Sequence, residues 1–232
     1  MNRREFTVGA LATMGLGSIA FAESDWHGQL DKWLQENSNI PTTLGPKLLP
    51  ANDPSWEEAH VILNNAPVSV TPIDVAKYFV TDVPQKWIKA WKDSDFANPV
   101  VVLFFAATNT KPSGDTTPWC TAFLNWCLAR SGLTGTNSAG SQSFANWGDT
   151  VWAVGSPMPG RAKPGDIAVF RHRSDPAHGH VAFYEAVSAD QANSIVILGG
   201  NHIAGTTHLI QEKTFPIDRD LELRRIASIK GL

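Results

Sequence analysis

The segment Pro118-Trp-Cys-Thr-Ala-Phe-Leu-Asn-Trp-Cys-Leu-Ala-Arg130 decides how the rest of the chain is interpreted. Its apolar residues recur at the spacing of one broad helix face, at positions 119, 122, 123, 126, 127 and 128. Pro118 suits a first helical position, where no backbone donor is needed, and Gly132 lies where helices commonly end. The pattern therefore predicts a helix that carries Cys120 in its first turn.

The predicted position of Cys120 favours a reactive thiol. Free backbone amides and the positive end of the helix dipole face the first helical turn, and both stabilise a thiolate. The dipole contributes only about 0.3–1 kcal/mol, which is less than one pKa unit. A working nucleophile therefore needs a second positive group, most simply a histidine. The alternative interpretation is a small buried hydrophobe, as most free cysteines are.

The chain has two cysteines, Cys120 and Cys127, which both fall on this helix. Seven residues of a straight helix separate their Cα atoms by about 10 Å. A disulfide requires Cα atoms within about 7 Å of each other. The spacing therefore predicts that no disulfide joins the two residues, and that Cys127 belongs to the core.

The composition is that of a globular protein. The chain has 232 residues, of which 43% are hydrophobic and 18% charged, enough to bury a sizeable core. Nineteen Lys and Arg stand against 22 Asp and Glu, for a formal net charge of −3. No basic run appears in the sequence, which excludes nucleic acid as an expected partner.

The N-terminal segment resembles an export signal. Arg3 and Arg4 precede an apolar run from Val8 to Phe21, and Ala20-Phe-Ala22 offers a small-x-small cleavage site. The adjacent arginines favour the twin-arginine route. An ordinary secretory signal and an uncleaved anchor are the alternatives, although the run is short for a membrane span. We expect residues 1–22 to be removed, leaving a periplasmic or secreted protein without a stable membrane anchor.

Helical patterns come first in the chain and strand patterns later, which predicts an α+β fold with an antiparallel sheet. The run at 100–105 also suits a strand, but the preceding Asn-Pro pair favours a helix. The predicted helices cover residues 25–37, 55–65, 71–80, 84–92, 100–105, 118–130 and 141–148. The predicted strands cover residues 165–171, 180–186 and 194–199, with weaker candidates at 207–213 and 221–228.

His180 is the candidate base for Cys120. It opens the second predicted strand directly after Gly179, where the missing side chain allows another group to approach. It would take the thiol proton and later protonate a leaving amine. His178 is a rival, because residues two apart share one face of a strand. We prefer His180 because the apolar strand begins there, whereas His178 follows a turn that starts at Asp175.

Three further residues are candidates for supporting roles. Asn201 could orient the histidine through its amide oxygen, or could be a plain turn residue after two glycines. Asp115 could position substrate, but a cap on the turn at Gly114 is the alternative. Trp119 could form one wall of a substrate cleft, or could simply cover the core.

A metal site is a second interpretation of the histidines. His178 and His180 form a His-x-His pair, and His202 and His208 follow in the sequence. Strand-borne pairs of this kind can bind zinc. No matching helix motif of histidine and carboxylate is present, and a metal leaves Cys120 unexplained. We therefore predict neither a metal nor another cofactor.

Four segments together resemble a known family. They are Thr117-Pro-Trp-Cys-x-Ala-Phe-x-Asn-Trp-Cys127, Pro164-Gly-Asp-Ile-x-Val-Phe170, Gly179-His-Val-x-Phe-Tyr184 and Leu198-Gly-Gly-Asn201. In this order and spacing they are similar to the bacterial CHAP group, which comprises cysteine- and histidine-dependent amidohydrolases and peptidases of the papain-like NlpC superfamily. The resemblance covers about residues 95–201.

The resemblance implies a cysteine at a helix start, packed on a small antiparallel sheet, and hydrolysis of amide bonds in peptidoglycan. Cys120, His180 and Asn201 match the motif positions of the family's catalytic groups. One position departs from the pattern: many members carry Glu two residues before the final Asn, where this chain has Gly199. The identity of the third catalytic group is therefore left open.

The sequence thus predicts an exported cysteine hydrolase, either an amidase or an endopeptidase, whose substrate is a peptidoglycan peptide. The expected organisation is a signal peptide over residues 1–22, a helical region over 23–94 and a catalytic domain over 95–232. Two alternatives remain. One is a non-catalytic wall-binding or scaffold protein that retains the fold, and the other is a toxin or processing peptidase that cuts proteins.

Overall fold

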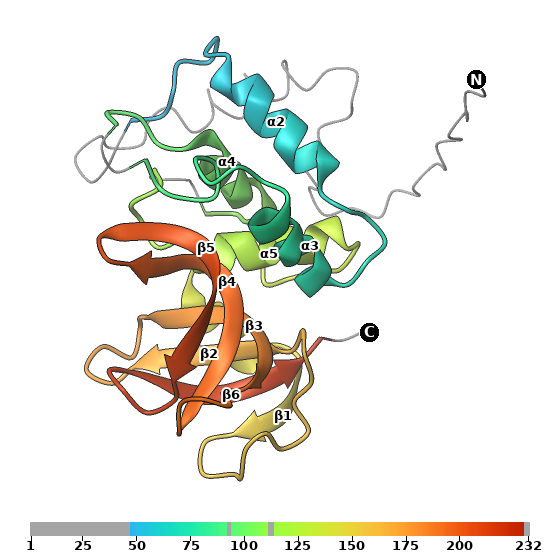
Figure 1. The fold of residues 1–232 in the computed structure, drawn as a ribbon, viewed down its shortest axis with the longest axis vertical. Coiled ribbons are helices and arrows are strands. Elements are labelled where there is room, and N and C mark those ends of the chain that lie inside the picture. The colour runs from blue at the N-terminus through green and yellow to red at the C-terminus, as the bar shows by residue number, and fades with distance from the viewer. Residues whose placement is uncertain (1–46, 92–93, 111–113, 230–232) are drawn as a thin grey trace.

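A computed structural model describes residues 47–91, 94–110 and 114–229, so the predicted signal peptide and the predicted helix over 25–37 lie outside the described residues. The helices precede the strands and gather on one side of the sheet (Figure 1). This arrangement confirms the predicted α+β fold. The helices are α2 (Ser55–Asn65), α3 (Pro72–Thr81), α4 (Pro99–Phe104) and α5 (Cys120–Arg130), with short 3-10 turns η2 (Phe105–Ala107) and η3 (Ser141–Asn146).

One antiparallel sheet holds six strands in the order β1-β6-β2-β3-β4-β5. The predicted strands are all present, and the structure adds an edge strand at residues 149–153 that the pattern did not indicate. The strands are β1 (Asp149–Ala153), β2 (Ile167–His172), β3 (Gly179–Val187), β4 (Ser194–Ala204), β5 (Thr207–Pro216) and β6 (Leu221–Ser228).

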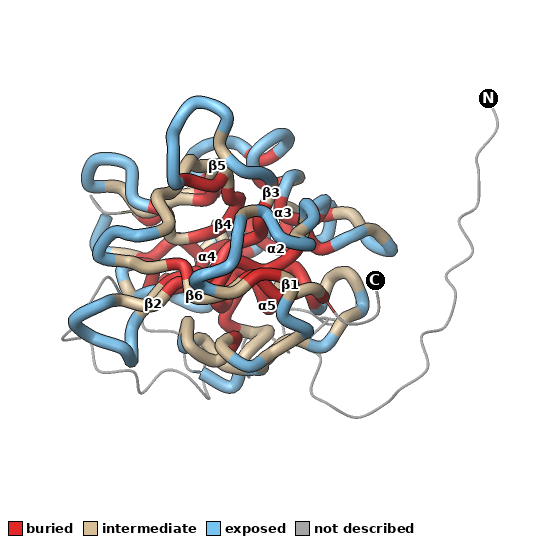
Figure 2. The backbone as a smooth tube through the Cα atoms, turned by 90° about the horizontal axis from the view of Figure 1, so that it is seen from below, coloured by how far each residue is buried: buried red, intermediate tan, exposed pale blue. Residues whose placement is uncertain are grey.

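Helix α5 lies between the sheet and the other helices. It is buried on nearly every side. This enclosure explains why its apolar residues are not confined to one narrow face. On the face of the sheet towards α5, alternate strand residues such as Val181 and Phe183 belong to the same hydrophobic cluster as the α5 side chains. The opposite face holds a second, smaller cluster that includes Phe170 and Ala182. The buried backbone accordingly runs through the centre of the molecule (Figure 2).

The predicted helix over 84–92 is wrong. Its local pattern is helical, but residues 88–90 run beside β5 instead and form backbone hydrogen bonds with it. The Ala90 amide donates to the His208 carbonyl, and the Ile210 amide donates to the Ile88 carbonyl, each at 2.8 Å. Pairing with the edge of the sheet therefore overrides helix propensity here. It gives the backbone amides and carbonyls of this segment and of β5 hydrogen-bond partners.

One hydrophobic core extends across the predicted boundary between the helical region 23–94 and the catalytic domain 95–232. The position of the boundary itself stays a prediction. Trp56 and Phe79, from α2 and α3, belong to the same buried cluster as Phe123 of α5. None of the helices in the described ranges is long and apolar enough to cross a membrane.

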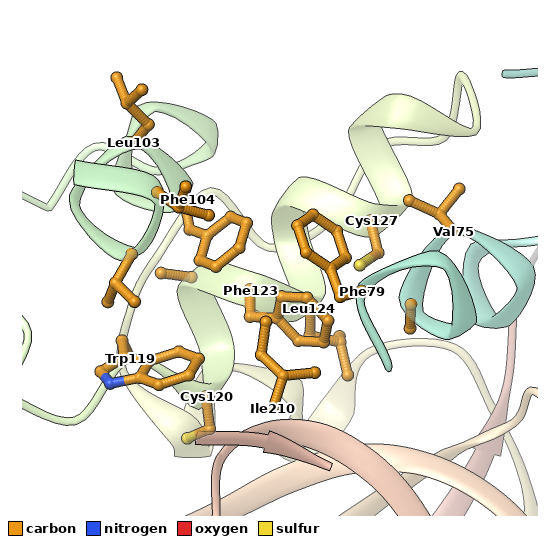
Figure 3. Close-up of a cluster of buried hydrophobic side chains, with 14 of the residues drawn as sticks. Val75, Phe79, Leu103, Phe104, Trp119, Cys120, Phe123, Leu124, Cys127 and Ile210 are labelled. Atoms are coloured by element: carbon orange, nitrogen blue, oxygen red, sulfur yellow. The ribbon is translucent and has the colours of Figure 1, made fainter. Parts of the chain in front are cut away.

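Phe79 is the centre of an aromatic cluster at the helix layer (Figure 3), which makes it a test of the shared core. Its ring contacts Phe104 and Phe123 edge-on at centroid distances of 5.4 and 5.5 Å. We expect Phe79→Ala to lower the free energy of unfolding by about 3–5 kcal/mol, as measured by urea denaturation. Val61→Ala, on the exposed side of α2, should change it by less than about 1 kcal/mol. An equally small effect at Phe79 would contradict the shared core.

Candidate active site

Cys120 is the first residue of α5, and its side chain points from the helix towards the sheet (Figure 3). The backbone amides of Val181 and Thr121 face the Cys120 sulfur and favour its thiolate, and the sulfur lies 3.7 Å from the Thr121 hydroxyl. The residue is only 1% exposed. Burial raises the pKa of the Cys120 thiol, and the amide hydrogen bonds offset part of that rise. The thiol is therefore protonated at neutral pH.

The sulfur lies where β3 and β4 stop pairing. Their register begins at Phe183 opposite Leu198 and does not include residues 179–182 or 199–202, which we call the open end of the β3–β4 pair. The Val181 amide at the open end faces the Cys120 sulfur and lowers the pKa of its thiol. Gly200 allows this approach, because a Cβ there would lie 2.4 Å from the Trp119 ring.

His180 directly precedes Val181, but its side chain lies on the opposite face of the sheet. Its ring stacks on Phe215 at a centroid distance of 6.0 Å and lies 4.8 Å from the ring of His202. Val181 belongs to the cluster that contains Cys120, so strand alternation directs the neighbouring His180 away from it. The structure thus brings the His180 backbone to the sulfur, while no hydrogen bond joins the imidazole to the thiol among the described residues.

His180 is neutral in this position. Burial lowers the pKa of its imidazole well below the ordinary value, and the nearby His202 and Lys213 lower it further. The Nε2 atom is buried and has no hydrogen-bond partner among the described residues. The rival histidine, His178, lies in a surface turn, where its Nδ1 atom is 2.7 Å from a carboxylate oxygen of Asp175.

In the structure, the side chain of Asn201 forms a hydrogen bond with His208, whereas the predicted partner was His180. Its Oδ1 atom lies 2.9 Å from Nδ1 of His208 on β5. The cause is an irregularity in β4: the β4–β5 register shifts between Gly199 and His202, and Asn201 has a φ of 61°. The bulge re-aims the amide, so in this structure the Asn201 oxygen faces His208 and not its predicted partner, His180.

The two predicted substrate-binding side chains do not reach solvent. Asp115 is 0% exposed, and its Oδ2 atom accepts from the backbone amides of Trp91 and Asn98 at 2.7 and 2.8 Å. Trp119 is also 0% exposed, and its indole nitrogen donates to the Asp115 carbonyl at 3.1 Å. In this structure Asp115 braces the loop before α4 and Trp119 covers the core, and a contact of either side chain with substrate stays a prediction.

His202 is the residue beside the site that pattern analysis left without a catalytic role. It is 2% exposed, and its ring is the imidazole neighbour of His180. Sequence spacing could not show this contact, because the two residues lie on different strands and the bulge in β4 sets which face His202 occupies. In the described part of the chain, no three His, Cys, Asp or Glu side chains are grouped to hold a metal ion. Both cysteines are free, so no disulfide joins them.

The raised pKa of Cys120 has a direct chemical consequence. In the protein without substrate, we expect iodoacetamide to alkylate Cys120 more slowly at pH 7 than it alkylates N-acetylcysteine, with a rate that increases as the pH rises. The alkylation rate can be measured by mass spectrometry of the peptide that contains Cys120. Rapid alkylation at pH 6 would show instead that an ion pair with a histidine already exists in the free protein.

Comparison with protein families gives a match over part of the chain. Residues 112–201 match the family model of the CHAP domain, and this range includes Cys120, His180 and Asn201. Neither the curated proteins nor the solved structures contain a match to the chain. CHAP domains are typically cysteine hydrolases, amidases or peptidases that act on peptidoglycan, and the helices followed by an antiparallel sheet agree with their papain-like fold. The chain therefore contains a CHAP domain over residues 112–201.

Proposed function

We propose that the protein is a cysteine hydrolase that cleaves amide bonds in peptidoglycan peptides, with Cys120 as nucleophile and His180 as base. One observation carries the proposal. Within the CHAP match, the first residue of α5 places its sulfur against the Val181 amide, directly beside the residue that would accept its proton. A helix start and a neighbouring histidine are the two features that activate a thiol.

The proposed reaction begins with a proton transfer. The Cys120 thiol gives its proton to Nδ1 of His180, the ring nitrogen nearer the backbone, and the sulfur attacks the carbonyl carbon of the amide. His180 then protonates the amine as the carbon–nitrogen bond breaks, which leaves a thioester on Cys120. Water attacks the thioester after losing a proton to His180, and the sulfur leaves with that proton to restore the thiol.

The start of α5 would also stabilise the reaction intermediate. The backbone amide of Cys120 has no intrahelical partner in the first turn, so it can donate to the oxygen that becomes negative when the sulfur attacks. A donor of this kind contributes about 3 kcal/mol to the transition state in acyl transfer. The helix dipole acts in the same direction.

The proposal requires a change at the open end when substrate binds. A neutral thiol and a neutral imidazole face opposite sides of the sheet in the free protein, and a charged pair would be costly in this buried setting. A bound peptide must bring the imidazole to the sulfur and supply the polar contacts that compensate for this cost. Activation by substrate is therefore part of the proposed mechanism.

The nucleophile can be tested on purified peptidoglycan and on soluble muropeptides. We expect the wild-type protein to release fragments and Cys120→Ala to release none above background, because no other group replaces the attacking sulfur. Mass spectrometry of the products would also show whether the bond cut is that of an amidase or an endopeptidase.

Cys127→Ala is the matched control, because Cys127 lies on the same helix, is equally buried and belongs to the hydrophobic core. It should retain activity within a few-fold at a temperature where it remains folded. Release of fragments by Cys120→Ala at the wild-type rate would refute the nucleophile assignment. Absence of release by the wild-type protein from every wall preparation would refute the hydrolase proposal.

Burial of the thiol favours one alternative function, a wall-binding protein without catalysis. Such a protein would sediment with insoluble peptidoglycan and release nothing from it. A protein-cleaving peptidase would instead degrade an unfolded protein such as casein and leave muropeptides intact. Both assays use the same wild-type and Cys120→Ala preparations, so the three functions give three different results.

We also propose export by the twin-arginine route, based on Arg3 and Arg4 and the apolar run that follows them. In cells, replacing both arginines with lysine should leave the full-length precursor in the cytoplasm, while the wild type yields an exported form that begins at Glu23. Immunoblots of cell fractions and N-terminal sequencing would measure both outcomes. Export of the double variant at the wild-type level would show that another route is used.

A further inference from the structure

An arginine on β2 extends the face of the sheet that carries Cys120. Val169 of β2 lies directly opposite Val181 of β3, and both belong to the same hydrophobic cluster as Cys120. Side chains alternate along a strand, so Arg171, two residues beyond Val169, faces the same side. This face of β2 therefore changes from buried aliphatic side chains to a half-buried guanidinium about 7 Å along the strand from the position beside the thiol.

Gly179 lies opposite Arg171 and contributes no side chain to the space between the guanidinium and the thiol. A Cβ at position 179 would lie 2.3 Å from Nε2 of Gln142, a residue of η3. This Nε2 atom donates to the Phe170 carbonyl at 2.9 Å, and the Oε1 atom of Gln142 has no hydrogen-bond partner among the described residues. The group that lies over Gly179 is therefore a neutral amide, which does not compensate the charge of Arg171.

Glu222 on β6 lies opposite Arg171 on the other side of β2, but two other arginines already engage its carboxylate. Nη1 of Arg224 lies 2.6 Å from one of its oxygens, and Nη2 of Arg173 lies 3.6 Å from the other. The hydrogen bond from Arg224 and the charges of the other two arginines lower the pKa of Glu222, so the carboxyl is ionised at pH 7. Three guanidinium groups thus share one carboxylate.

Arg171 is the arginine of this group that is left without a direct partner. Within the described ranges its guanidinium forms no hydrogen bond or ion pair, and it acts on Glu222 only through its charge. Asp218 and Asp220, in the turn before β6, are exposed and form no ion pair with the arginines in that part of the chain. A half-buried cation without a partner is costly, and a bound anion would recover that cost. The local excess of positive charge arises in a chain whose formal net charge is −3.

We infer that Arg171 binds a carboxylate of the peptide substrate, about two residues from the bond that Cys120 attacks. The inference rests on the proposed function and adds a substrate class to it, peptides with a free carboxylate near the cleaved bond. A guanidinium suits this role, because its planar donors match both oxygens of a carboxylate. Arg171 is the diagonal neighbour of Val181, whose amide faces the sulfur, and such neighbours lie about 7–8 Å apart, within reach of a long side chain.

Peptidoglycan peptides offer two sources of such a carboxylate, the α-carboxylate of the γ-linked D-glutamate and the C-terminal carboxylate. Three synthetic muropeptides separate them: one with both groups free, one amidated at D-glutamate and one amidated at the C-terminus. We expect one of the two amidations to lower the wild-type kcat/KM by about 10- to 100-fold, mainly through KM, the loss typical of removing a hydrogen bond to a charged group. Equal kcat/KM values on all three peptides would overturn the inference.

Variants at position 171 connect this preference to the guanidinium. Arg171→Gln should lower kcat/KM on the free peptide by the same factor and leave it nearly unchanged on the sensitive amidated peptide, which also shows that the variant is folded. Arg171→Lys should recover only part of the loss, because an ammonium cannot bind both oxygens in a planar pair. Arg161→Gln, at an exposed position in the loop before β2, changes the net charge equally and should keep the wild-type preference. A full carboxylate preference in Arg171→Gln would overturn the inference.

Binding measurements separate this inference from the proposed function. Calorimetric titration of the three muropeptides into Cys120→Ala measures affinity without turnover. We expect the same carboxylate preference there, and its loss in the double variant that also carries Arg171→Gln. Absence of hydrolysis by the wild type would refute the proposed function, and the titrations would still decide the role of Arg171. Equal or undetectable binding of all three peptides by Cys120→Ala would overturn the inference.

Discussion

The contact between the first turn of α5 and the open end of the β3–β4 pair organises the whole molecule. Gly200 has no side chain to keep the helix away, so the Trp119 ring and Phe123 lie directly on the β4 backbone. The Cys120 sulfur then faces the Val181 amide, which favours the thiolate. One close approach thus places the proposed nucleophile and joins the helical layer to the sheet.

The same burial that builds the site keeps its groups uncharged. Moving a thiolate and an imidazolium out of water costs several kcal/mol per ion, and their attraction repays this only when the geometry and hydrogen bonds are good. The free protein avoids the cost by holding a protonated thiol on one face of the sheet and a neutral imidazole on the other. A resting state of this kind limits reaction with adventitious electrophiles, and in the proposed mechanism the ion pair forms only when substrate arrives.

Asp115 shows how a residue next to the site can serve it without contacting substrate. Its buried carboxylate collects the amides of Trp91 and Asn98, and Asn98 in turn caps α4 by accepting from the Val100 amide. The same loop lies beside β5 through residues 88–90. The brace therefore aligns the helix layer, the edge of the sheet and the start of α5, which explains why a charged side chain is buried there.

Much of the fold was accessible from local pattern alone. The apolar stripe from Trp119 to Leu128, the Asn98 cap and the alternating strands predicted α5, α4 and most of the sheet, because periodicity and capping are properties of neighbouring residues. The helix predicted at 84–92 is absent, because the backbone partners of this segment lie on β5, more than a hundred residues away in the chain. The edge strand at 149–153 was missed because its exposed, polar start resembles a loop.

The sequence by itself determined the chemistry that is available: a cysteine at a helix start, a histidine at a strand start and the order of motifs that marks a CHAP domain. Only the tertiary structure decided which groups meet. The face on which His180 lies, the turn of Asn201 towards His208 and the contact between the rings of His180 and His202 all depend on strand register and on one bulge in β4. A shift of one residue exchanges the two faces of a strand, and spacing along the chain carries no information about that shift.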